Sequence, residues 1–523
     1  MSSLKRSLIA LLCVTMCFAA KASSEVKPSA LFSDHMVLQS GMQVPVWGTA
    51  DPAEKVIIKF NGQTRSATAD AAGKWMVRLT KLKAGGPFEM TIAGNKAGET
   101  VIVVKDVLVG EVWLGSGQSN MDFTVATTTR HYFAGVKNES EEVAAANYPQ
   151  IRMFTGAWKN SYEPQTEVSG TWLVVTPDTV KEMSAIGYLF ARDMQKELKA
   201  PFGIITEAFG ASTAEAWTSR EALASDAQLK PLLDTFDAKV AEYKTNPPDI
   251  TAALKAWQEA ADKAKADGKT VPRRPSNRNP VQDQHNPTVM YNGMIAPVIP
   301  YAIRGVLWYQ GEAINGGDTG YKLYPLLQST LIKDWRQRWG EGNFPFYICQ
   351  LAPLKSWPNR PDTWYNNPDV REAQATVLSL PNTGMAVTID IGDPVNIHPK
   401  DKQAVADRLT RIALAKTYGR KIEYSGPVYD SMRVEGSSIR ISFTHVTGGL
   451  VAKGGDLKTF IIAGKDGKFL PATARIDQGT VVVSSPDVPD PAAVRYAWDN
   501  YPEGCNLYNV DGLPAAPFRT DPW

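Results

Sequence analysis

The sequence predicts an α/β protein in which a mostly parallel sheet lies between two β-rich regions. Three observations predict this fold class. From about residue 106 to 420, short apolar runs alternate with amphipathic helical repeats, as in a parallel sheet covered on both faces. Before this region, from about 25 to 105, and after it, from about 421 to 523, short apolar runs are separated by turn residues, a pattern typical of β-sandwiches.

The first 22 residues have the pattern of a signal peptide. Lys5 and Arg6 precede an apolar run from Leu8 to Ala20, and Ala20-Lys21-Ala22 matches a small-x-small cleavage site. The run is too short to span a bilayer comfortably, although an uncleaved anchor is the alternative. No later stretch is long and apolar enough to insert stably. We therefore expect a secreted or periplasmic protein whose mature chain begins near Ser23.

Composition limits the choice of partners and cofactors. The 56 basic and 54 acidic residues leave a net charge of +2 with no basic block, which argues against nucleic acid as a partner. Beyond the signal peptide only Cys349 and Cys505 remain, either as one disulfide or as free thiols. No paired Cys or His spacing suggests a metal, and we expect no cofactor.

The N-terminal β region contains the runs 56–60, 75–79 and 88–92, each bounded by Gly, Asn or Asp turns. We expect a small sandwich that packs on the next domain, with sugar binding as the alternative. The C-terminal region repeats the pattern at 437–443, 460–462 and 480–484. It forms a second sandwich or completes the first.

The central region contains five candidate strands and two clear amphipathic helices. The strands are expected at 107–114, 203–208, 304–309, 345–351 and 385–389. The helices carry apolar stripes over 186–198 and 323–335. Residues 221–285 have the composition of an insertion, with helices over 234–244 and 252–265.

The turn from Gly115 to Met121 follows the first central strand and carries the candidate nucleophile, Ser119. Because ligands of open α/β sheets bind at the carboxyl ends of parallel strands, this turn faces the expected crevice. The alternative is an ordinary polar loop. The turn lacks the Gly-x-Ser-x-Gly pattern of α/β-hydrolases.

A serine hydroxyl needs a base to become a nucleophile, and the sequence has five histidines. His398 lies just past a strand and before a helix that starts near Lys400, where it would face Ser119. We expect structural roles for the other four, with His285 at the rim of the site as an alternative; the four are His35, His131, His285 and His445.

Two further strand ends supply candidate donors for an oxyanion hole. Gly210 presents its N–H without side-chain obstruction, and the Gln310 side-chain amide is a second donor. The N–H of Ser119 itself is a third.

These motifs together resemble the sialate O-acetylesterase family of the SGNH hydrolase superfamily, which is related to acetyl xylan esterases. The matching motifs are 117–121, Gly210 with 215–217, 308–312, and 390–393 with 397–399, supported by 31–39 and 291–297. The resemblance implies a flavodoxin-like hydrolase domain over 106–420 with flanking β domains at 25–105 and 421–523. It also implies removal of O-acetyl groups from sugars without a metal.

Carried over by position, the resemblance makes Ser119 the nucleophile and His398 the base, with Gly210, Gln310 and Ser119 forming the oxyanion hole. The third catalytic member is open. Many relatives have an aspartate three residues before the histidine, where this chain has Val395, and the next position is Asn396. Glu312 is the first choice for the acid, Asp393 the second and a Ser–His dyad the third.

The surrounding loops also depart from the family pattern. Ala211 follows Gly210 in place of a second glycine, and 313–315 reads Ala-Ile-Asn where Ser-Asn is expected after Glu312. These departures leave the acetylated sugar open. We expect an esterase acting through an acetyl-enzyme on O-acetylated sialic acid, with acetyl xylan or another polysaccharide as the alternative substrate. A non-catalytic glycan-binding protein is the alternative of another class.

Overall fold

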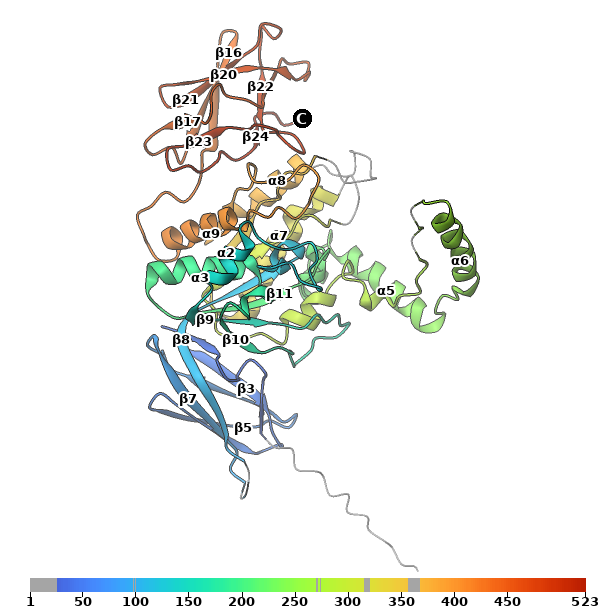
Figure 1. Cartoon of the computed structure of the whole chain (residues 1–523), viewed down its shortest axis with the longest axis vertical. Helices are drawn as coiled ribbons and strands as arrows, with labels where there is room; N and C mark the ends of the chain where they lie inside the picture. The colour runs from blue at the N-terminus through green and yellow to red at the C-terminus, as the bar shows by residue number, and fades with distance from the viewer. Residues whose placement is uncertain are drawn as a thin grey trace, which may run out of the picture.

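The computed structural model describes residues 26–523, apart from residues 97, 99, 270, 273, 315–319 and 356–366. The expected signal peptide lies outside the described residues. Figure 1 shows three parts stacked along the long axis: an N-terminal β region, a central α/β region and a C-terminal β region. The expected fold class, α/β with β-rich flanks, is confirmed at this level.

The N-terminal β region consists of two sheets around one core. β4 and β6 alternate buried and exposed residues, so that Val56, Ile58, Trp75 and Val77 enter a common core. One sheet contains β1 (Lys27–Pro28), β3 (Val44–Thr49) and β6 (Lys74–Leu79). The other contains β2 (Val37–Gln39), β4 (Lys55–Phe60), β5 (Gln63–Thr68), β7 (Gly85–Ala93) and the first part of β8.

β8 (Ile102–Gly117) joins the N-terminal and central regions. Its first half pairs with β7, and its second half lies between β11 and β12 in the central sheet. The boundary expected between residues 105 and 106 therefore falls inside one continuous strand. This same strand ends at the turn that carries Ser119.

The central strands follow the order β10-β9-β11-β8-β12-β13-β14. Neighbours from β9 to β14 pair in parallel, and β10 pairs antiparallel at the edge. The five expected strands correspond to β8, β11 (Phe202–Ala208), β12 (Gly305–Tyr309), β13 (Phe346–Cys349) and β14 (Thr383–Ala386). The sequence did not predict β9 (Tyr148–Thr155) or β10 (Trp172–Val175), because β9 begins with polar, partly exposed residues and β10 has only four residues.

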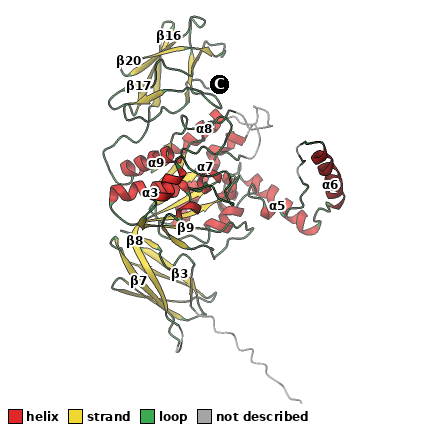
Figure 2. Ribbon diagram, viewed as in Figure 1, coloured by secondary structure: helices red, strands yellow, loops and turns green. Residues whose placement is uncertain are grey.

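Helices cover both faces of this sheet (Figure 2). Successive residues of β12 point to opposite cores: Val306 and Trp308 to one, Leu307 and Tyr309 to the other. On the Leu307 side lie α3 (Ala185–Leu198) and α9 (Lys402–Lys416), and on the Trp308 side α7 (Gly320–Trp339) contributes Trp335. The shorter helices α1 (Ser119–Asp122), α2 (Glu139–Ala145) and α8 (Asn367–Ala375) complete the layers.

The insertion forms a helical arm that projects from the body in Figure 1. It contains α4 (Arg220–Ala224), α5 (Lys230–Thr245) and α6 (Thr251–Ala266), so both helices expected there are confirmed. Within α6, Ala261 is the only buried residue among those described.

The C-terminal region has its own core at the opposite end of the molecule from the N-terminal sheets. One sheet contains β15 (Val428–Glu435), β16 (Ser438–Thr444), β21 (Thr480–Ser484) and β20 (Thr473–Asp477). Another contains β19 (Leu470–Pro471), β18 (Phe460–Ala463), β22 (Ala493–Tyr496) and β24 (Phe518–Arg519), and β17 (Leu450–Ala452) pairs with β23 (Leu507–Asn509). Of the two expected alternatives, this arrangement is a second, separate β region.

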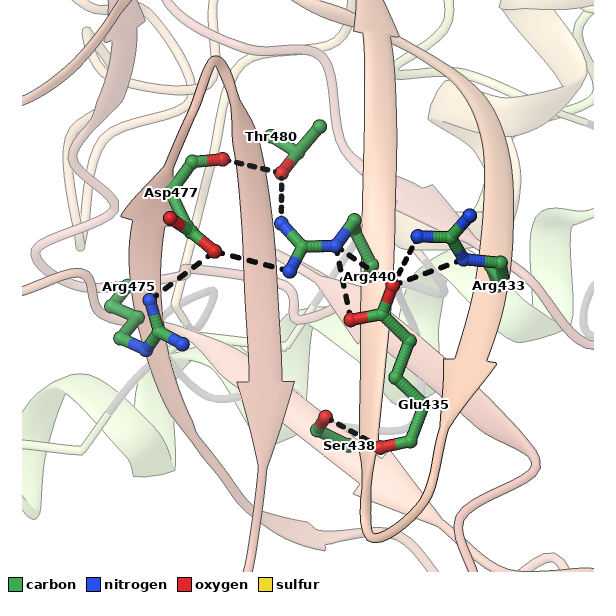
Figure 3. Close-up of polar contacts among 7 residues, drawn as sticks. All are labelled: Arg433, Glu435, Ser438, Arg440, Arg475, Asp477 and Thr480. Atoms are coloured by element: carbon green, nitrogen blue, oxygen red, sulfur yellow. Dashed lines mark hydrogen bonds and ion pairs between the residues drawn. The ribbon is translucent and has the colours of Figure 1, made fainter.

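An ion-pair ladder crosses the sheet of β15, β16 and β20 (Figure 3). Arg433 and Arg440 lie directly opposite each other, which would be repulsive without a counter-charge. Glu435 pairs with both arginines, and Asp477 pairs with Arg440 from β20. The ladder thus neutralises neighbouring like charges across three strands.

Buried polar contacts fasten the C-terminal region to the central one. Arg371 of α8 is 1% exposed, and its guanidinium donates to the carbonyls of Leu351, Asp499 and Asn500. Cys349 and Cys505 are free thiols, so the expected alternative of a disulfide is not observed. In the described part of the chain, no helix has the length and apolarity required to cross a membrane.

Candidate active site

The turn after β8 places Ser119 at the first position of α1. Gly117 has a φ of +132°, and a Cβ there would lie 2.1 Å from the carbonyl oxygen of Tyr309, so this position requires glycine. The Gln118 N–H donates to that same carbonyl, and its side-chain oxygen accepts from the N–H groups of Gly311 and Ala313. The turn that carries Ser119 is therefore held against the end of β12.

His398 meets Ser119 across the carboxyl edge of the sheet. Its Nε2 lies 2.9 Å from Ser119 Oγ, although 279 positions separate the two in the chain. Asn396 supports the histidine by accepting a hydrogen bond from its backbone N–H, and α9 begins four residues later with Asp401 as its N-cap. The structure brings the two residues of the expected nucleophile–base pair into hydrogen-bond distance.

Burial and a nearby cation lower the pKa of His398 to about 4, the desolvation being the larger effect and the charge of Lys402 the smaller. The imidazole is therefore neutral at physiological pH, the form that accepts a proton from a hydroxyl. The other four histidines each pair with a carboxylate: His35 with Asp106, His131 with Asp122, His285 with Asp283 and His445 with Glu423.

The structure places neither candidate acid on His398. Asp393 accepts from the N–H groups of Val395 and Asn396, which shapes the loop before the histidine. Glu312 accepts from the side-chain amide of Asn120. Among the described residues, no carboxylate hydrogen-bonds to His398, so the geometry corresponds to the Ser–His dyad, the third of the expected alternatives.

Of the candidate oxyanion donors, Gly210 lies beside the nucleophile. A Cβ built on Gly210 would be 3.6 Å from the Cβ of Ser119. Gln310 differs from the expectation, because its amide nitrogen already donates to the carbonyls of Ser212 and Ala313, at 3.2 and 2.7 Å. Its amide oxygen accepts from the Tyr324 hydroxyl. Gln310 thus braces two strand-end loops, and its N–H groups are engaged rather than directed to an oxyanion.

An aromatic wall, which was not predicted from the sequence, borders the Ser119–His398 pair. Phe133 stacks on His398 with 4.2 Å between ring centroids, and His131 contacts both Phe133 and Trp158 edge-on. Trp158 in turn contacts Phe209, the residue before Gly210. These rings come from irregular loops, where no periodicity marks them.

The rim of this wall carries a cation. Trp158 is 43% exposed and donates its ring N–H to the carbonyl of Ala208. The guanidinium of Arg130 lies 4.0 Å from the Trp158 ring centroid, within cation–π range. A guanidinium stacked on a partly exposed tryptophan is suited to an anionic group.

A buried polar network underlies the pair. Lys402, the first residue of α9, is 0% exposed, and its Nζ donates to Asn120 Oδ1 at 2.6 Å. Asn120 donates in turn to Glu312 and, at 3.0 Å, to the carbonyl of Ile397. Burial lowers the pKa of Lys402 to about 7 against the opposing charge of Glu312, and burial raises the pKa of Glu312. Lys402 was not predicted from the sequence, since a lysine at the start of a helix is usually solvated.

Comparisons with known proteins identify the family of the chain. Residues 281–414 match the family model described as "Carbohydrate esterase, sialic acid-specific acetylesterase". The sialate O-acetylesterase of Mus musculus is 30% identical over 93% of this chain and 92% of its own length. That of Homo sapiens is 29% identical over 90% of this chain and 88% of its own length.

A solved structure shares the whole architecture. The carbohydrate acetylesterase from Xanthomonas citri superposes with a TM-score of 0.78 at 34% identity, covering 95% of this chain and 100% of that one. The similarity thus extends over all three regions, not over the central sheet alone. The chain belongs to the sialate O-acetylesterase family of carbohydrate esterases.

Proposed function

We propose that the protein hydrolyses acetyl esters on sugars through a covalent acetyl-serine. The observation that carries the proposal is the 2.9 Å contact between Ser119 Oγ and His398 Nε2 at the carboxyl edge of the sheet. The family supplies the esterase activity, and the dyad supplies a nucleophile with a neutral base beside it.

In the first half-reaction, Ser119 Oγ attacks the carbonyl carbon of the acetyl group while His398 takes the hydroxyl proton. The carbonyl oxygen becomes an oxyanion, for which we propose the backbone N–H groups of Ser119 and Gly210 as donors; one such donor is worth ~3 kcal/mol of barrier. The tetrahedral intermediate then collapses, the C–O bond to the sugar breaks, and His398 returns the proton to the sugar oxygen.

In the second half-reaction, His398 takes a proton from water, and the hydroxide attacks the acetyl-serine. Collapse of this intermediate releases acetate and returns the proton to Ser119. The atoms and electrons of both half-reactions balance with the ester, water and these two residues.

The test is acetate release by Ser119→Ala with an O-acetylated sugar or p-nitrophenyl acetate. Loss of turnover is expected, because the mechanism assigns the attacking oxygen to Ser119; Ser225→Ala, at the end of α4, is the matched control. Mass spectrometry of rapidly quenched wild-type enzyme should find an acetyl group on Ser119. Full activity in Ser119→Ala would contradict the proposal, and glycan binding without turnover by the wild type would favour the non-catalytic alternative.

For the substrate, we propose an acidic sugar, O-acetylated sialic acid, over neutral acetylated xylan. What supports this is Arg130, whose guanidinium stands over Trp158 at the exposed rim, because arginine pairs well with carboxylates. Acetate release from the two substrates should favour the sialic acid. Arg130→Met should raise KM for O-acetylated sialic acid and leave KM for acetylated xylan unchanged. An equal rise in KM for both substrates, or no change in either, would show that Arg130 does not recognise the acidic group.

We also propose that residues 1–22 direct the protein to secretion or the periplasm and that residues 106–420 form an SGNH-type hydrolase domain. The basic start, the apolar run and the Ala-Lys-Ala site support the first point. N-terminal sequencing of the exported protein should find its first residue near Ser23. A mature protein that begins at Met1 would contradict this.

A further inference from the structure

The amide of Asn120 connects the two halves of the Ser119–His398 pair. Asn120 follows Ser119 directly in α1, and it donates to the carbonyl of Ile397, the residue before His398. One side chain therefore spans the turn that carries the nucleophile and the peptide that carries the base. The orientation of that amide decides whether this contact is made.

Two buried charges fix the orientation of the Asn120 amide. Its oxygen accepts from the ammonium of Lys402, and its nitrogen donates to the carboxylate of Glu312. With both N–H groups and the oxygen engaged, reversal of the amide would turn the oxygen toward the carboxylate and the nitrogen toward the ammonium. The charges therefore hold the amide in the one orientation that donates to Ile397.

The buried ammonium is costly, which argues for a function. Lys402 is 0% exposed, and its Nζ lies 4.4 Å from the ring centroid of Phe123 and 5.5 Å from that of Tyr309. A buried cation is strongly disfavoured unless it is paired or hydrogen-bonded. Here the carboxylate of Glu312 stands on the far side of Asn120, so the amide carries the interaction between the two charges.

We propose that Lys402 is a positioning residue of this active site, which aligns Ser119 with His398 through Asn120. The inference rests on the proposed hydrolytic function. It assigns to a buried lysine a part in orienting the pair, whereas in other serine hydrolases an acid orients the histidine.

The groups around the two residues bear on the pH dependence. Lys402 contacts Asn120, Phe123 and Tyr309. The titratable groups whose charge acts on it are Glu312 after β12, Cys349 of β13 and its neighbour Asp401. His398 is faced by Ser119 and Phe133, with Lys402 as the nearby charge. The cation is therefore the charge that acts on His398 in the described part of the site.

The test is the pH profile of Lys402→Met, which keeps an apolar stem and removes the charge. We expect kcat to fall ~10²-fold, the size of effect that misplacement of a catalytic group by about 1 Å can produce, with KM within about twofold of wild type. Because the charge of Lys402 is the smaller cause of the lowered pKa of His398, the acid limb of kcat/KM should move up only part of the way toward the ordinary histidine range. A merely structural role would lower stability without moving that limb.

The controls separate the possible failures. Lys416→Met, at the other end of α9, should leave both limbs in place. If Lys402→Met does not fold, Lys402→Gln, which keeps a donor for Asn120, must shift the acid limb in the same direction. An unmoved acid limb and unchanged kcat in the folded variant would overturn the proposal. If instead Ser119→Ala keeps full activity, the hydrolytic function itself is wrong.

Discussion

The ring of Phe133 lies against the imidazole of His398, with 4.2 Å between centroids and 27° between planes. The loop that carries Phe133 is anchored by a buried pair two residues earlier, in which His131 Nε2 lies 2.9 Å from Asp122 of α1. Because Asp122 belongs to the same short helix as Ser119, this pair connects the loop of Phe133 to the helix of Ser119. The Phe133 ring packs against the imidazole, to which no carboxylate of the described residues hydrogen-bonds.

We expect Phe133→Ala to lower kcat more than it changes KM. The truncation frees one face of the imidazole, so that His398 spends less time at 2.9 Å from Ser119. We expect kcat to fall about tenfold or more, since a small misplacement of a catalytic group can cost about 10²-fold. Phe133→Tyr, which keeps the ring, should retain most of the activity; equal losses in both variants would contradict a stacking role.

Activity should persist to unusually acidic pH. The neutral imidazole is the active base, and its pKa is lowered to about 4, so kcat/KM should be full above that value and fall as pH decreases through it. In the other direction, the Lys402 ammonium is lost as pH rises through about 7, which should weaken the alignment of the pair. A bell-shaped profile of initial rates is expected between these limits. An acid limb near pH 6.5 would show that His398 is not perturbed.

Glu312→Gln distinguishes the network from a catalytic triad. The glutamine keeps an oxygen that accepts from Asn120, so we expect a loss in kcat of less than about tenfold. Removal of a triad acid costs about 10⁴-fold in kcat in a serine protease. Steady-state kinetics of Glu312→Gln and of Asp393→Asn distinguish the network from the triad. A loss near the larger value in either variant would restore that residue as the partner of His398.

Arg371→Met should loosen the C-terminal region. The buried guanidinium satisfies three backbone carbonyls, and a buried group left without its partner costs ~1–3 kcal/mol. We therefore expect a destabilisation of several kcal/mol and earlier proteolysis near residues 499–500. Thermal unfolding and limited proteolysis measure this effect. Arg433→Met, on the exposed ladder of Figure 3, should cost far less, since surface ion pairs contribute about 0–1 kcal/mol.

Local patterns predicted most of the central sheet and the positions of Ser119 and His398 at its carboxyl edge. The apolar run before Gly115 and the glycine-rich turn after it are sufficient to place Ser119 at the end of β8, because a buried strand and a tight turn both depend on neighbouring residues. The same reasoning placed His398 after β14. It failed for β9 and β10, whose residues become strand-like only through their neighbours in the sheet.

The expected roles of Gln310 and Glu312 could not be settled by motif. Both residues stand where the family pattern has them, yet one braces Ser212 and Ala313 and the other binds Asn120. A hydrogen-bond partner depends on the direction of a side chain, and direction depends on packing far along the chain. The motif therefore predicts which residues gather at the site, not what each one contacts.

The sequence by itself determined the fold class, the helical insertion, and Ser119 and His398 as the reacting candidates, because each of these follows from periodicity, turn chemistry or an intact motif. Only the tertiary structure decided that His398 is supported by Phe133 and lies near the buried charge of Lys402 rather than against an acid. Burial and charge proximity join residues that are hundreds of positions apart, as 282 positions separate Asn120 from Lys402. No local pattern records that distance.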